Sequence, residues 1–144
     1  MPHNEILESL LVTSNRLIRI AAQATGNTTP SAVWRTLSIL ENLGPMRVGE
    51  LAAASRISQP GMTRLLPVMI DEGLVSRAVD RDDSRALVIG LTRVGRERLI
   101  AWRHELSTTL EPLFGDLEPR EWQTLERAAA ILASRTAIRV GEAA

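Results

Sequence analysis

Two short helical patterns separated by only two residues constrain the fold of this chain more than any other feature. The first pattern, ELAAAS, covers about residues 49–55. The second begins after Ser58, a good N-cap, has Pro60 in its first turn and runs to Glu72, where Gly73 stops it. Two helices joined by so short a connection predict a helix-turn-helix unit.

A β-hairpin is predicted directly after this unit. Residues 74–79 and 86–91 are rich in β-branched and aliphatic side chains, and the charged run DRDDSR lies between them. The run could be a solvated turn, a cation-binding loop or a contact surface. A calcium loop needs Gly at its sixth position and Glu at its twelfth, where this chain has Arg85 and Leu91, so no metal site is expected. A helix-turn-helix followed by a hairpin is a winged helix.

Two helices are predicted before the winged-helix motif. Apolar residues recur at helical spacing over 4–24 and form two adjacent stripes, so this helix is expected to pack on more than one partner. Thr29 is predicted to cap a second helix with Pro30 at its first position, and this helix runs to about Leu43.

Two more helices are predicted after the hairpin. Thr92 is expected to cap a long helix that runs to about Phe114. Pro119 then opens a last helix that runs to about Ile138.

The expected fold is therefore mainly α with a small β-hairpin. We predict a single domain over residues 1–144, with a winged-helix core at 30–91. The flanking helices at 4–24 and 92–138 carry surplus apolar surface, which they are expected to bury against a second copy across a two-fold axis.

Composition removes several classes of function. The chain has no Cys, which excludes disulfides and thiolate metal sites, and no apolar run approaches the ~18 residues of a membrane span. The start of the chain lacks the basic and apolar segments of a secretory signal, so the cytoplasm is the expected compartment. Two His, no Tyr, no G-x-S-x-G and no phosphate loop leave little for catalysis, so neither an enzyme nor a cofactor is expected.

The distribution of charge points to a basic centre. The chain has 17 basic residues, all of them Arg, and a net charge of zero, yet residues 47–103 hold ten Arg against seven acids. Arg suits bidentate contact with phosphate or guanine. A chance asymmetry in an Arg-rich chain is the alternative explanation.

Five short motifs resemble the multiple-antibiotic-resistance regulator (MarR) family of transcription factors. They are ELA at 50–52, S-Q-P-x-x-T-R-L at 58–65, E-G-L-V-x-R at 72–77, D-x-x-D-x-R at 80–85 and L-T-x-x-G at 91–95. The resemblance implies a homodimer whose terminal helices dimerise, whose second short helix enters the major groove of double-stranded DNA and whose wing reaches the minor groove. It also implies release of DNA by a small aromatic or phenolic ligand in many members.

Two departures from the family pattern concern the DNA-binding part of the chain. Arg47 stands where a capping Thr is common, so the first short helix is expected to lose its side-chain cap. Pro67 lies inside the second short helix and is expected to kink it or to loosen its last turns.

The resemblance assigns contacts with DNA to the second short helix and the wing. Gln59 can pair with adenine, Arg64 with guanine or phosphate, and Arg85 can enter a narrow minor groove. Asp83 and Arg77 are predicted to brace Arg85. The full set of predicted DNA-binding residues is Ser58, Gln59, Gly61, Met62, Thr63, Arg64, Arg81 and Arg85.

A ligand pocket is also implied where the long helices meet the DNA-binding layer. Arg16, Arg19, Trp34 and Trp102 would suit an aromatic carboxylate, although both Trp could instead be core residues and both Arg solvated. The predicted function is a dimeric regulator, and more specifically a repressor, on a pseudo-palindromic operator. The alternative is a dimeric winged-helix module that acts mainly through a protein partner.

Overall fold

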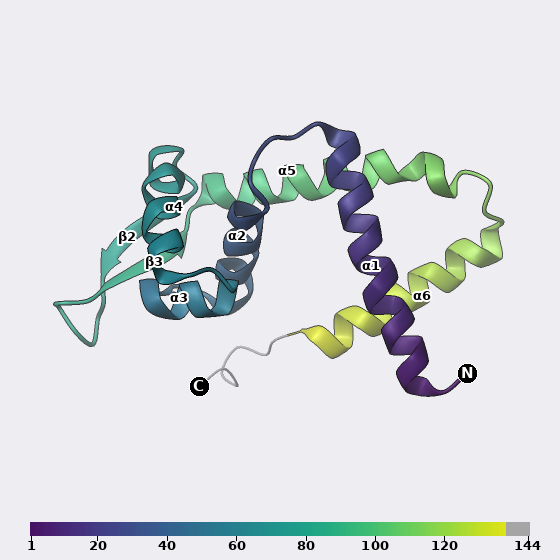
Figure 1. The fold of residues 1–144 in the computed structure, drawn as a ribbon, viewed down its shortest axis with the longest axis horizontal. Coiled ribbons are helices and arrows are strands. Elements are labelled where there is room, and N and C mark those ends of the chain that lie inside the picture. Colours follow the sequence, from purple (N-terminus) through teal and green to yellow (C-terminus); the bar gives the residue numbers. More distant parts are fainter. Residues whose placement is uncertain (138–144) are drawn as a thin grey trace. The chain divides into compact units, whose positions relative to one another are not determined.

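The computed structural model describes residues 1–137 of the chain (Figure 1). The elements follow in the order α1 (His3–Thr25), α2 (Ser31–Leu43), β1 (Met46–Arg47), α3 (Val48–Ser55), α4 (Gln59–Asp71), β2 (Val75–Val79), β3 (Leu87–Leu91), α5 (Arg93–Leu110), the 3₁₀ helix η1 (Glu111–Phe114) and α6 (Pro119–Thr136). The predicted mainly α fold with a small β element is confirmed. Among the described residues, no helix has both the length and the apolar character that crossing a membrane requires.

The described residues form two compact units. The winged-helix unit comprises chiefly residues 29–101 and contains α2, α3, α4, the three strands and the first half of α5. The helical unit comprises residues 1–28 and 102–135, and contains α1, the second half of α5, η1 and most of α6.

The sheet of the winged-helix unit has three antiparallel strands in the order β1-β3-β2. The predicted hairpin is confirmed, since β2 and β3 pair from Val75 opposite Leu91 to Val79 opposite Leu87. β1 was not predicted; it pairs Met46 with Ile89 across the sheet. A two-residue strand is too short to show an alternating pattern in the sequence.

The core of the winged-helix unit draws side chains from each of its layers. Six large side chains there have no exposed surface: Leu37, Leu51, Met62, Met69, Ile89 and Leu99. They come from α2, α3, α4, β3 and α5. This packing holds one face of α4 against the core, so its opposite face is left to solvent.

Thr92 joins the end of the hairpin to the start of α5. Its hydroxyl oxygen accepts from the backbone N–H of Gly95 at 2.9 Å, as expected of a cap, and the hydroxyl donates to the carbonyl oxygen of Gly73. The backbone N–H of Thr92 donates to the carbonyl oxygen of Leu74 at 3.1 Å. A Cβ on Gly95 would lie 2.0 Å from that carbonyl oxygen, so the junction requires glycine.

The predicted start of the second helix is wrong. The N-cap of α2 is Pro30, with φ −57° and ψ 140°, and the helix begins at Ser31 without a side-chain cap bond. Because ψ of Pro30 is extended, this residue precedes the helix, and Thr29 lies one position too early to cap it.

The long helix after the hairpin also ends earlier than predicted. α5 ends at Leu110 and continues as η1 to Phe114, because Pro112 cannot donate the backbone hydrogen bond that an α-helix needs. The last helix begins at Pro119, as predicted, and extends to Thr136. Its predicted end at Ile138 lies outside the described residues.

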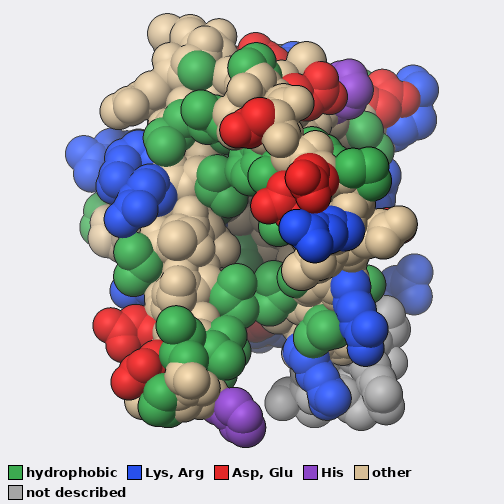
Figure 2. Space-filling model, turned by 90° about the vertical axis from the view of Figure 1, so that its right-hand side faces the viewer, with side chains coloured by type: hydrophobic (Ala, Val, Ile, Leu, Met, Phe, Trp, Pro, Cys, Tyr) green, Lys and Arg blue, Asp and Glu red, His purple; other side chains and the backbone are tan. Residues whose placement is uncertain are grey.

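The helical unit exposes much of its apolar surface. Ala21 is the buried residue of α1, and no described residue of α6 is buried. Figure 2 shows hydrophobic side chains open to solvent among charged ones on one face of the molecule. Large apolar side chains of this unit that are 42% or more exposed are Met1, Ile6, Leu7, Leu11, Val12, Ile18, Leu113, Trp122, Leu125 and Ile131.

Candidate nucleic-acid interface

Ser58 starts α4 as the sequence predicts. Its backbone is extended, and its side-chain oxygen accepts from the N–H of Gly61 at 3.1 Å. Packing within the chain explains why residue 61 is glycine, since a Cβ there would lie 2.9 Å from the side-chain oxygen of Ser58 and 3.1 Å from a methyl carbon of Ile57. Close approach to DNA is therefore not needed to explain this glycine.

The first turns of α4 present polar groups to solvent. Gln59, Thr63 and Arg64 are exposed and line one open depression together with Pro60. The Thr63 hydroxyl donates to the carbonyl oxygen of Gln59 at 2.9 Å, so its proton is already used within the helix. The Gln59 amide and the Arg64 guanidinium carry the donors that match base edges and phosphate.

Met62 is a correction to the predicted set of DNA-binding residues. Its side chain has no exposed surface. The helical repeat places Met62 on the same face as Leu66 and Met69, and all three are buried. Its side chain therefore belongs to the core of the winged-helix unit, and we leave it out of the candidate interface.

Pro67 does not interrupt α4, which runs unbroken from Gln59 to Asp71. Because proline has no N–H, the carbonyl oxygen of Thr63 loses its partner within the helix. Pro67 itself is exposed.

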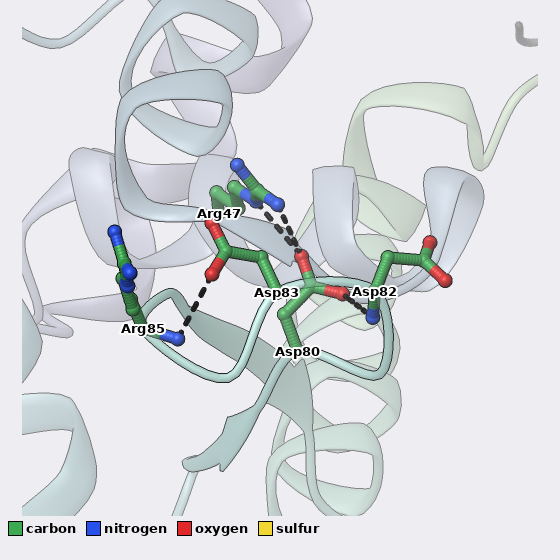
Figure 3. Close-up of polar contacts among 5 residues, drawn as sticks. All are labelled: Arg47, Asp80, Asp82, Asp83 and Arg85. Atoms are coloured by element: carbon green, nitrogen blue, oxygen red, sulfur yellow. Dashed lines mark hydrogen bonds and ion pairs between the residues drawn. The ribbon is translucent and has the colours of Figure 1, made fainter.

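The wing, formed by β2, β3 and the loop between them, is organised by aspartates (Figure 3). Asp80 closes the hairpin, since its N–H donates to the carbonyl oxygen of Ala86 at 3.0 Å. One oxygen of the Asp80 carboxylate accepts from the N–H of Asp82, and one of the Asp83 carboxylate from the N–H of Arg85, each at 3.0 Å. Both aspartates thus form Asx turns that shape the loop.

Arg47 and Asp80 form an ion pair that the sequence analysis missed. The Nε and Nη2 atoms of Arg47 both lie 2.8 Å from the same carboxylate oxygen of Asp80 (Figure 3). The backbone N–H of Asp82 and then this guanidinium lower the pKa of Asp80, and the Asp80 carboxylate raises the pKa of Arg47. Arg47 is the N-cap of α3 and, as predicted, makes no side-chain cap bond there.

Of the predicted brace of Arg85 by Asp83 and Arg77, the structure shows the contact between the Asp83 carboxylate and the backbone of Arg85. Within residues 1–137, the Arg77 side chain makes no ion pair with Asp83, whose carboxylate instead holds the backbone N–H of Arg85. The negative charge of Asp83 helps to raise the pKa of Arg47, but its effect is smaller than that of Asp80. Arg77 lines a cavity of about 230 Å³ with side chains of α4 and β3, including Thr63, Leu66, Pro67, Leu87 and Ile89.

Several guanidinium groups of the winged-helix unit have no protein partner among the described residues. Arg64 of α4 and Arg81 and Arg85 of the wing are all exposed and form no ion pair there. Arg56, also exposed, ends α3 with φ 57° and is the one described non-glycine residue with positive φ. Sequence reasoning passed over Arg56, because nothing in its neighbours signals a left-handed backbone. Unpaired Arg side chains around a helix N-terminus and a wing form a surface suited to an anion.

The four predicted ligand residues divide between the two units. Arg16, Arg19 and Trp102 belong to the helical unit, where both Arg are exposed and Trp102 is half-buried. Trp34 belongs to the winged-helix unit and is 5% exposed, so it packs in the core of that unit.

Comparison with known proteins identifies the family. The sequence model of the MarR family matches residues 27–86. An HTH-type transcriptional regulator of Mycobacterium bovis and one of Mycobacterium tuberculosis are each 31% identical over 96 residues, which cover 67% of this chain and 67% of theirs.

Solved structures share the fold over nearly the whole chain. The structure of RV1404 from Mycobacterium tuberculosis has a TM-score of 0.68 at 23% identity and covers 96% of this chain and 97% of its own. The apo form of wild-type MarR from E. coli has a TM-score of 0.64 at 19% identity, with 92% and 96% covered.

Regulators of this family bind DNA, and they are not enzymes. The order of elements, the wing and the exposed arginines agree with that class. The chain is a member of the MarR family of winged helix-turn-helix, DNA-binding transcriptional regulators.

Proposed function

We propose that the chain is a homodimeric repressor that binds a pseudo-palindromic operator in the cytoplasm of a bacterium. The observation that carries this proposal is the display, on α4 and on the wing, of Arg64, Arg81 and Arg85, which are exposed and form no ion pair within residues 1–137. The first turns of α4 enter the major groove, where Gln59 and Arg64 contact base edges or phosphate. Arg85 enters the adjacent minor groove, and Arg81 contacts phosphate.

Exposed apolar surface on the helical unit supports the dimer. α6 buries no described residue within the chain, although Trp122, Leu125 and Ile131 are all large and apolar. A surface patch of this kind on a soluble chain is typical of an interface. Two copies related by a two-fold axis would present two copies of α4 about one helical turn of DNA apart, ~34 Å.

Release of the operator by an aromatic carboxylate is the remaining part of the proposal. The exposed Arg16 and Arg19 lie one turn apart on α1 and carry the charge that a carboxylate needs, and Trp102 offers an aromatic surface. Trp34, the fourth predicted ligand residue, packs in the core of the winged-helix unit, so this part of the proposal rests on Arg16, Arg19 and Trp102 of the helical unit. Family membership does not favour a module that acts mainly through a protein partner.

Fluorescence anisotropy of a labelled upstream DNA fragment tests the function directly. If each subunit makes ~5 phosphate contacts, the slope of log K against log salt for the dimer is about −9. Repeating the titration with a panel of aromatic acids tests release, and sedimentation tests the dimer. Absence of salt-dependent binding to the upstream region would refute the proposal.

The variant Arg85→Ala tests the wing. Loss of a minor-groove contact should weaken binding by roughly 1–3 kcal/mol and leave thermal unfolding unchanged. Arg120→Ala removes an equal charge from the exposed surface of α6, where Arg120 pairs with Glu118, and should change operator affinity much less. An Arg85→Ala protein that fails to fold would instead make Arg85 a structural residue.

A further inference from the structure

The Arg47–Asp80 pair connects two elements that are not neighbours in the sheet. Arg47 is the last residue of β1, and Asp80 directly follows β2, while β3 lies between these strands in the order β1-β3-β2. Two strand spacings amount to about 10 Å, so the long Arg47 side chain has to reach past β3 to the base of the wing loop. The pair therefore ties the edge of the sheet, where α3 begins, to the root of the loop.

Asp80 is the point from which the loop is built. One carboxylate oxygen of Asp80 contacts both Nε and Nη2 of Arg47, and the other oxygen accepts a hydrogen bond from the backbone N–H of Asp82. Its own N–H donates to Ala86, the residue that follows Arg85. The Asp80 side chain is 16% exposed, whereas that of Arg47 is 44% exposed, so the carboxylate is the better fixed of the two groups.

We propose that Arg47 and Asp80 are positioning residues, and we call their ion pair the clamp. The clamp fixes the conformation of the wing loop, so that Arg85 is already placed to enter the minor groove. The inference rests on the proposed function, because it assumes that the wing contacts DNA. The clamp acts through the short chain of bonds from Asp80 to Ala86 and from Asp83 to Arg85. It requires no contact between Arg47 and DNA.

Energetic reasoning favours positioning over stability as the role of this pair. Exposed ion pairs contribute little to the free energy of unfolding, because solvent screens them and two long side chains lose freedom. A loop that is already ordered loses less conformational entropy when it binds, so a clamp of this kind acts on affinity. The charge of Asp80 itself opposes binding to a polyanion, and Arg47 offsets that charge locally.

The variant Asp80→Asn gives the inference a distinctive sign. It removes a negative charge close to the DNA-binding wing, so electrostatics alone predicts tighter binding. The clamp predicts the opposite, a loss of roughly 3- to 10-fold in operator affinity, because asparagine keeps the acceptor for the Asp82 N–H but loses the ion pair. Asp82→Asn is the matched control, since the exposed Asp82 carboxylate bonds to no described residue. The operator affinity of this variant should equal or exceed that of the wild type.

A double-mutant cycle separates positioning from direct contact. In a protein that already carries Arg85→Ala, adding Asp80→Asn should lower the operator affinity by less than about 2-fold, because the side chain that the clamp positions is absent. Arg47→Gln breaks the same pair from its other side, and Arg47→Gln with Asp80→Asn should bind no more weakly than Arg47→Gln alone. Anisotropy with the operator measures all of these, and thermal unfolding verifies that each variant is folded.

The outcomes distinguish the clamp from the proposed function. If Arg85→Ala binds the operator as the wild type does, the wing contact is refuted, and the clamp with it. If Arg85→Ala weakens binding but Asp80→Asn does not, the wing contact stands and the clamp alone is overturned. An Asp80→Asn loss that is equally large with and without Arg85 also overturns the clamp.

Discussion

Replacing Gly95 by alanine should destabilise the winged-helix unit, because the first turn of α5 lies against the backbone of Leu74. An added Cβ would lie 2.0 Å from the Leu74 carbonyl oxygen and 2.8 Å from a methyl carbon of Leu91. The Leu91 side chain can rotate away, but the carbonyl oxygen is backbone and already accepts from the N–H of Thr92 at 3.1 Å. Relief of the overlap therefore requires α5 to move and this hydrogen bond to lengthen.

The expected loss of stability follows from the steric overlap and from the lengthened hydrogen bond. Overpacking of a rigid site costs about 1–3 kcal/mol, and loss of one backbone hydrogen bond costs about 1 kcal/mol more. Gly95→Ala should thus lower the free energy of unfolding by about 2–4 kcal/mol. Urea unfolding followed by circular dichroism measures it, with both proteins at the same concentration because a dimer's stability depends on concentration.

Gly49→Ala is the matched control, because it makes the same chemical change in α3. A Cβ on Gly49 would meet no atom within 4 Å, so the variant should be as stable as the wild type or more stable by up to about 1 kcal/mol. Equal unfolding midpoints for the two alanine variants would refute the close approach of Gly95 to Leu74.

Two further predictions concern Ser55 and Asp80. The Ser55 hydroxyl is buried and has no hydrogen-bond partner among the described residues, so Ser55→Ala should raise the free energy of unfolding by about 0.5–2 kcal/mol in the same urea assay; a loss of stability would show that the hydroxyl is bonded after all. The folded state lowers the pKa of Asp80, first through the Asp82 N–H and then through Arg47, so the stabilisation is present above the unfolded pKa of about 3.9 and is lost as the pH falls through the lower folded value. In unfolding series from pH 7 to pH 3, the stability difference between the wild type and Asp80→Asn should shrink toward the acid end, and a difference independent of pH would contradict this assignment.

Local chemistry in the sequence determined the order of the elements and several of their ends. Ser58 caps α4 and Thr92 caps α5, as expected, because each hydroxyl bonds an N–H only three residues away. Gly73 adopts a positive φ of 74° directly after α4, which few other residues tolerate. Such signals act over one turn of chain, so they can be found without knowledge of the fold.

The candidate interface was predicted only in part, because exposure depends on how a helix is turned toward the core. The sequence predicted Met62 as a DNA-binding residue together with Thr63 and Arg64, yet Met62 is fully buried while these two neighbours are exposed. The periodicity of α4 holds Met62, Leu66 and Met69 on one face, but it took the packed core to show that Met62 lies on the buried side.

Contacts between distant residues were decided by the tertiary structure alone. β1 exists because β3 pairs with it, and two residues of sequence carry no trace of that pairing. Arg47 and Asp80 are 33 residues apart, and the sequence offers Asp80 several other arginines as partners, among them the nearby Arg81 and Arg77. The strand order of the sheet determines which arginine pairs with Asp80, because it brings the side chain of Arg47 to the root of the wing. Arg77 and Arg81 form no ion pair with Asp80 within the described residues.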